Sequence, residues 1–261
     1  MPAVTDTPPE PVLLAFGAAA PPVRLPGGRG TSWRAGELVL KPAPSGALPT
    51  IEWLDRVAPS VSARARLRLA VPVRAADGAL VVDGWSATRW LPGAAPVGAW
   101  LDRAAVAREL AGAFASVDPL ELPRRDDAWA TADRIAWDEE DGPLGDHPLA
   151  RVRTPLAAAE ETVVHGDLAG NTLLHPELPP AVIDLSLYAR PVEWSVAVLA
   201  VDVVAFDGAP IELLRTISPD PSFPQHLVRA LLFRMITDEL LGDAPRPAYL
   251  PVVEQVLALA R

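Results

Sequence analysis

The chain is poor in several residue types, and each shortage limits what it can do. Its 261 residues include no cysteine, so disulfides, thiol nucleophiles and thiolate metal sites are excluded. The formal net charge is -10, and no basic tract interrupts the acidic surplus. Because nothing would offset phosphate repulsion, we expect no nucleic acid among its partners.

Long hydrophobic runs are also missing. The longest, Trp194 to Phe206, is interrupted by Asp202 and is too short to span a bilayer, so it predicts a buried helix. The opening, Met1 to Asp6, is acidic and proline-rich, where a secretory signal would be basic and then apolar. Hydrophobic residues make up 50% and charged residues 21%, as in ordinary globular proteins. We expect a cytoplasmic protein of one large domain or two lobes, with no membrane partner.

Lysine and asparagine each occur once. Lys41 is the one lysine among 23 basic residues, the others being arginine, and Asn171 is the one asparagine. Since this chain uses arginine almost wherever a cation suffices, both residues are expected where no substitute works. The alternative is a compositional bias that leaves each of them on the solvated surface. The motifs around them favour the functional interpretation.

One stretch carries most of the information. Leu173–Leu174 and Ala181–Ile183 are predicted to be short strands, joined by a loop of turn formers and strand breakers. If Leu174 pairs with Ala181, Asn171 lies directly opposite Asp184, with Cβ atoms about 5 Å apart. An amide oxygen and a carboxylate at that separation can share Mg²⁺, which takes further ligands from water and phosphate. Asp167, just before this hairpin, would be a third acid with a different role.

A glycine-rich loop is expected near the N-terminus. Strands predicted at Val23–Leu25 and Trp33–Arg34 flank the loop Pro26–Ser32, which holds three glycines, and a third strand follows at Leu38–Lys41. Glycine lets backbone N–H groups approach an anion without obstruction by Cβ, although a flexible turn is the alternative. Lys41 could reach the same anion as a compact charge on a long stem, the alternative being a solvated strand end.

A helix is predicted from Ile51 to Val57, capped by Thr50 and ended before Pro59. Glu52 on this helix is a candidate to hold the single lysine by an ion pair. Asp55 competes for that role, and a plain surface position is open for either carboxylate.

The hydrophobic pattern changes class at Gly93. Before it the pattern predicts a sheet of at least five strands, and after it the spacing is helical, so the fold class is α+β. Further strands are expected at residues 66–74, 79–82 and 85–91, with a tight turn at Asp83-Gly84. Helices are expected at residues 100–118, 127–137, 149–160, 192–206, 210–217, 224–241 and 248–260.

Phosphoryl transfer needs a glycine hairpin, a lysine and a carboxylate–amide set of this kind. Its transition state spreads negative charge that backbone donors, a lysine and Mg²⁺ can hold while an acceptor hydroxyl is aligned. Each fragment is common, but their order and combination are not. Together they favour a kinase.

Two motifs in the second half resemble a known family. His165-Gly166-Asp167-Leu168 with Asn171 resembles the catalytic loop, and Ile183-Asp184 the metal-binding strand, of the aminoglycoside phosphotransferase and choline kinase group within the protein-kinase-like fold. The resemblance implies that Asp167 orients or deprotonates the acceptor hydroxyl, while Asn171 and Asp184 carry Mg²⁺. His165 is expected to be a structural hydrogen-bonding residue of the loop.

The same resemblance implies how ATP would be held. Lys41 would contact the α- and β-phosphates, and backbone near Thr88 to Trp90 would bind adenine. The loop covering the nucleotide would consist of Gly27, Gly28, Arg29, Gly30, Thr31 and Ser32. A bilobal fold follows, with a nucleotide-binding lobe at residues 1–92 and a catalytic, acceptor-binding lobe at 93–261. Shorter motifs, such as Val39-Leu40-Lys41-Pro42, look like an actinobacterial branch of the group.

The chain departs from the family pattern at several positions. Gly166 and Ala169 replace the Arg and Lys of protein kinases, which points to a small-molecule acceptor. One residue fewer separates Asp167 from Asn171 than is usual. Asp184 is followed by Leu185-Ser186, so a kinase-style switch is not implied. The family's later structural aspartate has no clear equivalent, and the candidates to replace it are Glu193 and Asp202.

The leading hypothesis is therefore an ATP-dependent phosphotransferase acting on a hydroxyl of a small molecule. One alternative is a degenerate kinase-like protein that binds nucleotide or a partner without catalysis, as the shortened loop suggests. Another is transfer of AMP instead of phosphate. The acceptor, the choice between ATP and GTP, and the oligomeric state are not specified by any motif.

Overall fold

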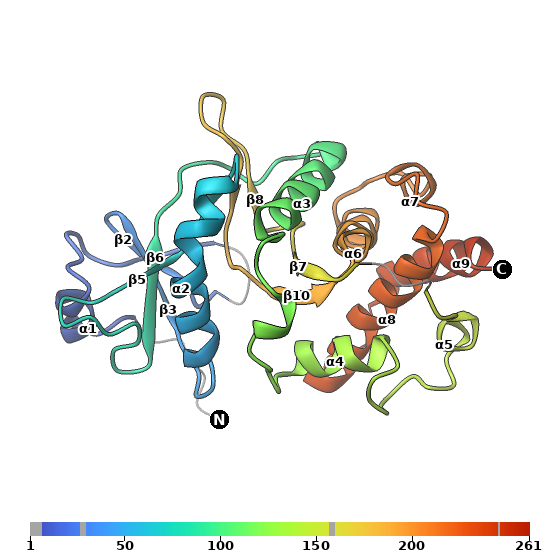
Figure 1. Ribbon diagram of the computed structural model, residues 1–261, viewed down its shortest axis with the longest axis horizontal. Helices are drawn as coiled ribbons and strands as arrows, with labels where there is room; N and C mark the ends of the chain where they lie inside the picture. The colour runs from blue at the N-terminus through green and yellow to red at the C-terminus, as the bar shows by residue number, and fades with distance from the viewer. Residues whose placement is uncertain (1–6, 27–29, 157–159, 245) are drawn as a thin grey trace. The chain divides into compact units, whose positions relative to one another are not determined.

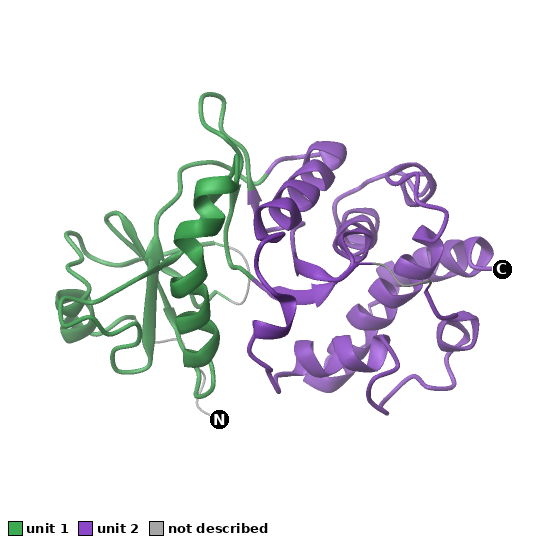
Figure 2. Cartoon of the chain, in the orientation of Figure 1, with its two compact units in different colours: residues 1–95, 173–185 green, residues 96–172, 186–261 purple. Residues whose placement is uncertain are grey.

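A computed structural model describes residues 7–26, 30–156, 160–244 and 246–261 (Figure 1). The chain divides into two compact units, the first comprising residues 1–95 and 173–185 and the second residues 96–172 and 186–261 (Figure 2). The α+β class is confirmed, with an antiparallel sheet in the first unit and mostly helices in the second. The segment 173–185 therefore packs with residues far from it in the sequence.

The first unit is built on a five-stranded antiparallel sheet. Its strands run in the order β1 (Val23–Arg24), β2 (Trp33–Ala35), β3 (Leu38–Pro42), β6 (Trp85–Arg89) and β5 (Pro72–Val73). Leu38 and Leu40 on β3 and Ala87 on β6 alternate toward one face, as a half-buried strand requires. Val12 and Phe16, at helix α1 (Glu10–Ala15), belong to the same buried cluster. The strands predicted at β1, β2 and β3 are thus confirmed.

Helix α2 (Leu48–Arg64) corrects the expected short helix. The chain enters the helix before Thr50, which therefore is not its cap, and continues through Pro59 to Arg64. Proline inside a helix costs about 3 kcal/mol or more, because it removes a hydrogen bond. The buried face of α2 offsets that cost, since burial of each large apolar side chain stabilises the fold by about 1.5–3 kcal/mol. The buried residues of α2 are Trp53, Leu54, Val57, Ala58 and Val61.

The single strand expected at residues 66–74 is wrong, because two short strands there belong to different sheets. β5 joins the five-stranded sheet, whereas β4 (Arg68–Leu69) pairs in parallel with β9 (Ala181–Val182). β9 in turn neighbours β8 (Thr172–Leu173), so the predicted strand pair around this hairpin is confirmed. The pairing of β4 with β9 explains why residues 173–185 belong to the first unit.

The strand expected at residues 79–82 is also wrong. Only an isolated bridge from Val82 to Trp85 forms there. The turn is as expected, since Asp83 and Gly84 have φ angles of 47° and 75°, the left-handed values of a tight hairpin turn.

The second unit packs helices around a two-stranded antiparallel ribbon of β7 (Thr162–His165) and β10 (Leu187–Arg190). α4 (Ala128–Ala136) and α6 (Val192–Phe206) pack against α8 (Phe223–Leu241), and α3 (Trp100–Phe114) packs against α6 and β7. The same unit also contains η1 (Pro119–Glu121), α5 (Pro148–Val152), α7 (Leu213–Thr216), η2 (Pro247–Tyr249) and α9 (Leu250–Leu259). None of the described helices is long and apolar enough to cross a membrane.

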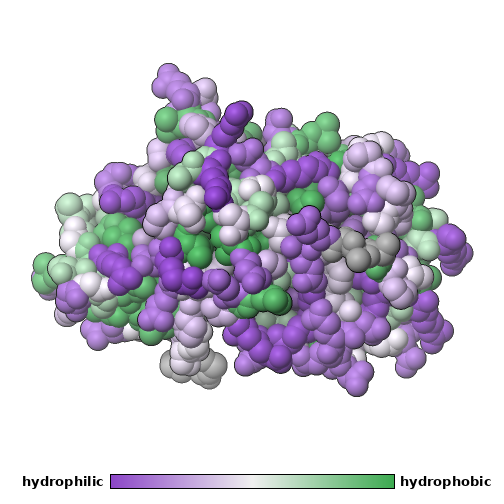
Figure 3. Space-filling view, in the orientation of Figure 1, coloured by the Kyte–Doolittle hydropathy of each residue, from purple (hydrophilic) through white to green (hydrophobic). Residues whose placement is uncertain are grey.

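Sequence and structure agree closely on α3, α4, α6 and α8. The helix expected at residues 149–160 is too long, because α5 ends at Val152 and the chain is extended at Arg153. Thr154 precedes Pro155, and a residue in that position avoids the helical region. Residues 157–159 lie outside the described part of the chain. In Figure 3 hydrophilic and hydrophobic side chains are interspersed on the face in view, and the exposed apolar residues of the protein include Val97 and Leu120.

Candidate functional site

In the first unit, Lys41 and Asp184 form an ion pair, with 2.9 Å between Nζ and Oδ1. Lys41 lies on β3 opposite Ser86, which places its side chain on the face away from Leu40. Asp184 follows β9 and has a φ of 51°, a left-handed conformation that residues other than glycine rarely adopt. Strained conformations of this kind cluster at functional sites. The structure thus brings together the predicted phosphate ligand and one predicted metal ligand.

The two carboxylates considered as partners of Lys41 both lie on α2. Asp55 pairs with Arg74, at 2.5 Å between Oδ2 and Nη2, so the competing expectation for Asp55 is wrong. Glu52 is exposed, and its pairing with Lys41 stays a prediction.

The glycine loop is described only in part. Gly27, Gly28 and Arg29 lie outside the described residues, so their predicted contact with phosphate is open. Gly30 has a φ of 67°, and its carbonyl accepts a hydrogen bond from Arg24 Nε at 2.6 Å. Ser32 closes the hairpin through its carbonyl, which accepts from the N–H of Leu25 at 2.9 Å. Thr31 lies within this closed hairpin, and its role in binding stays a prediction.

The segment predicted to bind adenine is the end of β6. Thr88 pairs with Val39 of β3 and with Pro72 of β5, so its backbone lies between two strands. The N–H of Trp90 donates to the carbonyl of Glu37 at 2.8 Å, which engages that donor. The role of Thr88 to Trp90 as an adenine hinge stays a prediction.

In the second unit, His165 ends β7 and is buried. Its Nδ1 accepts from the N–H of Asp167 at 2.9 Å, while Nε2 lies 3.3 Å from the backbone nitrogen of Ser186. Ser195 on α6 donates its hydroxyl to the carbonyl of His165 at 2.5 Å. His165 is therefore a structural part of the loop, as predicted.

Ser195 was not predicted from the sequence. The residue expected to brace the loop at this point was Glu193 or Asp202. Glu193 instead accepts from Arg108 at 3.1 and 3.2 Å. A serine in an apolar helix carries no motif, so only the packing of α6 against β7 reveals this contact.

Gly166 is required by close packing. A Cβ at this position would lie 2.4 Å from Cε2 of Tyr188, closer than any real contact. Tyr188 is fixed by edge-on packing against Trp194 and Phe233, with ring centroids 5.3 and 5.6 Å away. The glycine in this motif thus has a steric cause, independent of the acceptor that the protein uses.

The shortened loop turns Asn171 back onto Asp167. Nδ2 of Asn171 donates to the carbonyl of Asp167 at 2.7 Å and to Oδ2 of its side chain at 3.0 Å. A spacing of four residues places both on one side of a helical turn, and the N–H groups of Asn171 and Thr172 indeed both bond to the carbonyl of Leu168. Both amide hydrogens of Asn171 are engaged, so its amide oxygen is the atom that can meet a cation.

Arg234 on α8 contacts Asp167 from the other side. Its Nη2 donates to Oδ1 of Asp167 at 2.7 Å, and its Nε donates to Oδ1 of Asp202 at 2.9 Å. Burial opposes the charge of Arg234, but the two carboxylates outweigh it and raise its pKa. Burial raises the pKa of Asp202, and Arg234 opposes that shift. Asp202, one of the two candidates for the family's structural aspartate, is thus a buried, paired carboxylate. It acts on the loop through Arg234, which the sequence did not reveal.

Arg103 on α3 also anchors the loop, and no motif in the sequence identifies it. Its side chain is 1% exposed, and Nη1 donates to the carbonyl of Ala169 at 2.9 Å. Nη2 donates to the carbonyl of Gly98 at 2.6 Å and pairs with Asp207. An arginine within an otherwise apolar helix stripe is the one available signal for such a residue.

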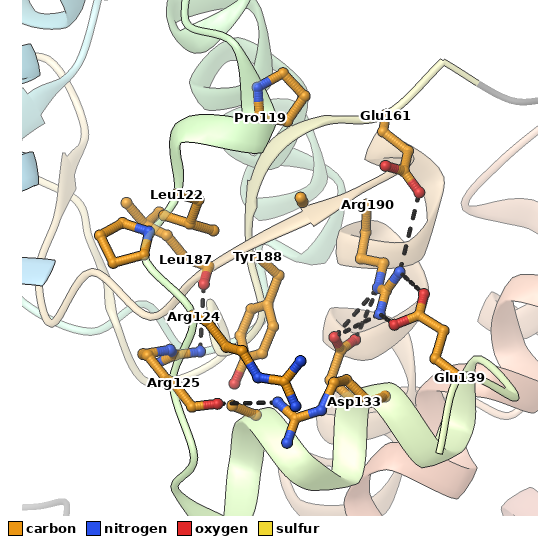
Figure 4. A pocket seen from close by; sticks show the side chains of 14 residues that line it. Pro119, Leu122, Arg124, Arg125, Asp133, Glu139, Glu161, Leu187, Tyr188 and Arg190 are labelled. Atoms are coloured by element: carbon orange, nitrogen blue, oxygen red, sulfur yellow. Dashed lines mark hydrogen bonds and ion pairs between the residues drawn. The ribbon is translucent and has the colours of Figure 1, made fainter. Parts of the chain in front are cut away.

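A cavity of about 270 Å³ lies beside β10 and α4 (Figure 4). Charged side chains of both signs line it, among them Arg190, Asp133 and Glu139. Arg190 is held by Asp133 at 2.8 Å and by Glu139 at 2.6 Å. Because two carboxylates already neutralise this buried arginine, we assign the cluster to the packing of β10 on α4.

The predicted site residues therefore fall into two described groups. Lys41 and Asp184 pair within the first unit, and Asp167 and Asn171 bond to each other within the second. The predicted meeting of Asn171 and Asp184 across the hairpin stays a prediction. Among the described residues, no group of three or more His, Asp or Glu could hold a metal unaided.

Comparison with known proteins supports the fold class. An aminoglycoside phosphotransferase from Alicyclobacillus acidocaldarius matches with a TM-score of 0.64 and 16% identity, over 98% of this chain and 95% of that one. An amicoumacin kinase solved with AMP-PNP and Ca²⁺ matches with a TM-score of 0.60 and 13% identity, over 92% and 87%. A choline/ethanolamine kinase family protein from Mesorhizobium loti matches with a TM-score of 0.51 and 20% identity, over 94% of both chains.

At these identities the likeness shows a shared fold with small-molecule kinases. No protein-family profile and no curated protein sequence matches the chain. The expected actinobacterial placement stays a prediction.

Proposed function

We propose that the protein is an ATP-dependent phosphotransferase that moves the γ-phosphate to a hydroxyl of a small molecule. One observation carries the proposal. Within a fold shared with small-molecule kinases, the amide nitrogen of Asn171 donates to the carbonyl and to the carboxylate of Asp167, so its amide oxygen is the atom that would bind a cation. This arrangement links a candidate metal ligand to a carboxylate that can align an acceptor.

Asp167 would align the acceptor hydroxyl. The hydroxyl oxygen bonds to the γ-phosphorus, the bond to the β–γ bridging oxygen breaks, and ADP leaves. The hydroxyl proton passes to Asp167 or to solvent. Such transfer depends on positioning and on stabilisation of negative charge more than on strong basicity.

The donor set fits Mg²⁺. Asp184 would supply a carboxylate and Asn171 an amide oxygen, and Mg²⁺ usually takes its remaining ligands from water and phosphate. Mg²⁺ bound there would neutralise charge on the phosphates during transfer. Lys41 would exchange Asp184 for the α- and β-phosphates when nucleotide binds. The relative that was solved with AMP-PNP and Ca²⁺ supports a nucleotide and a divalent cation as ligands.

The remaining assignments complete the proposal. The loop with Gly27, Gly28, Gly30, Thr31 and Ser32 would cover the phosphates, and residues 88–90 would bind adenine. Glu52 would take up Lys41 when Asp184 binds the metal. Residues 1–92 would act as the nucleotide-binding lobe and residues 93–261 as the catalytic and acceptor-binding lobe of a cytoplasmic enzyme.

A non-catalytic nucleotide-binding protein is the second candidate. The observation that favours it is the ion pair between Lys41 and Asp184, which occupies two of the proposed ligands with each other. Retention of Asp167 and Asn171 in a bonded arrangement favours catalysis.

The test begins with thermal shift and calorimetry, using ATP and GTP with and without Mg²⁺. A library of small alcohols and amino alcohols is then screened for ADP production, with mass spectrometry to separate phosphate from AMP transfer. We expect Mg²⁺-dependent ATP binding and transfer of phosphate. The variant Asp167→Asn should bind ATP normally and lose turnover by about 100-fold or more. Undiminished turnover in that variant would refute the role of Asp167, and binding without any ADP production would favour the second candidate.

A further inference from the structure

Arg234 is a charged residue in a buried part of α8. Its neighbours Leu231, Leu232, Phe233 and Ile236 belong to the core, and its own side chain is 11% exposed. The guanidinium bridges two carboxylates, one on α6 and one in the loop that follows β7. A buried arginine needs a partner, because an unpaired buried charge is strongly destabilising.

Asp202 alone meets that need. Asp202 is itself buried and accepts from both Nε and Nη2 of Arg234. This bidentate geometry best neutralises a guanidinium. Asp167 is different, since its side chain is 48% exposed and water could solvate it. The contact between Arg234 and Asp167 is therefore not required to compensate a buried charge. It restrains the orientation of Asp167.

The restraint is two-sided. Oδ1 of Asp167 is held by Arg234 at 2.7 Å and Oδ2 by Asn171 at 3.0 Å, so the plane of the carboxylate is set by two donors. Each carboxylate oxygen accepts more than one hydrogen bond, so a lone pair remains for an incoming hydroxyl. A misplacement of about 1 Å in a group that aligns reactants can cost about 100-fold in rate.

We propose that Arg234, anchored by Asp202, is a positioning residue that sets the side chain of Asp167 for alignment of the acceptor hydroxyl. This inference rests on the proposed function. On this proposal Arg234 acts through Asp167 and is not itself a ligand of the nucleotide or the acceptor. Its removal is therefore expected to lower kcat and to leave nucleotide binding unchanged.

Three variants separate positioning from a general loss of structure. Arg234→Met should lower kcat by about 10- to 100-fold with KM for ATP within about twofold, and Arg234→Lys should recover part of the loss. Arg246→Met is the matched control, because Arg246 also pairs with a buried carboxylate of α8, Asp238, at 2.9 Å. The control should lose stability without a comparable loss of kcat. Equal kcat losses in both variants, or none in Arg234→Met, would overturn the proposal.

The double variant Asp167→Asn/Arg234→Met gives a second readout. If Arg234 acts through Asp167, the double variant should turn over no more slowly than Asp167→Asn alone. If the kcat loss of the double variant equals the product of the losses of the two single variants, Arg234 has an independent structural role and the proposal is overturned.

A third measurement does not depend on turnover. Urea unfolding of the two single variants and the double variant should reveal a coupling of several-fold in the unfolding equilibrium constant. If Arg234→Met does not fold, Arg234→Lys takes its place in the cycle. Absence of coupling would overturn the proposal even in an active enzyme. If the variants show this coupling but the wild-type protein consumes no ATP, the proposed function is overturned instead. A role for Arg234 in positioning Asp167 for catalysis is then overturned with it.

Discussion

Nζ of Lys41 lies 2.9 Å from Oδ1 of Asp184, so a residue of β3 neutralises the residue that follows the short strand β9. The residue proposed to bind the phosphates and a residue proposed to bind the metal are thus paired with each other. On the proposed function, binding of Mg²⁺ and ATP separates this pair. Both side chains remain partly solvated, which keeps the cost of separating them low.

Lys41→Met is expected to weaken Mg²⁺–ATP binding by about tenfold or more, because the phosphates lose their cationic partner. Its effect on the free energy of unfolding should stay below about 1 kcal/mol, since ion pairs open to solvent contribute little. Calorimetric titration and urea unfolding measure the two effects. Arg64→Met, at an exposed position in the last turn of α2 in the same unit, is the control and should change neither. Unchanged ATP affinity in Lys41→Met would contradict the assignment.

Asn171→Ala is expected to raise the Mg²⁺ concentration needed for half-maximal ATP turnover by about tenfold or more, because one oxygen ligand is lost. Asn171→Asp, which keeps an oxygen at this position, should need less Mg²⁺ than the alanine variant. Turnover measured against Mg²⁺ concentration decides the point. The same Mg²⁺ requirement in all three proteins would exclude Asn171 as a metal ligand.

Gly166→Ala is expected to destabilise the protein by about 1–3 kcal/mol, because the new methyl group would lie 2.4 Å from the ring of Tyr188. Gly170→Ala is the matched control in the same loop, since a methyl group there meets nothing within 4 Å. Urea unfolding of both variants compares the two positions. Similar stabilities would show that Tyr188 moves aside and that packing does not require the glycine.

Acid is expected to destabilise the second unit through His226. This buried side chain has its pKa lowered to about 4, mainly by burial. The unfolded chain therefore binds the proton more readily than the folded chain. The contribution of neutral His226 to the free energy of unfolding is fully present above about pH 6.5 and is lost as the pH falls toward 4. Between pH 7.5 and pH 5 the expected loss is about 2 kcal/mol.

Urea unfolding at the two pH values tests this expectation. His226→Leu removes the titrating group, so it should lose clearly less stability on acidification than the wild type. An equal loss in both proteins would assign the acid sensitivity to other groups.

Local features were predictable from the sequence because they depend on neighbouring residues. The turn at Asp83-Gly84, the buried helix α6 and the strand pair β8–β9 follow from turn chemistry and from hydrophobic spacing. The loop motif likewise places Asp167 and Asn171 four residues apart, close enough to bond through one turn of chain.

Tertiary packing decided what local propensity could not. α2 continues through Pro59 because the apolar face that it buries offsets the lost hydrogen bond, and β4 pairs with β9 although more than 110 residues separate them. The residues that hold the loop are also distant from it in the sequence. Arg234 lies 67 positions from Asp167, and Ser195 lies 30 positions from His165.

The composition alone shows which side chains are available for chemistry, namely one lysine, one asparagine and the acids around them. The residues that orient these side chains become visible only in the folded chain. The contact of Arg234 with Asp167 arises when helices pack together. Helix packing depends on the burial of whole apolar faces, so the residues next to a single charged side chain on such a face do not reveal its partner.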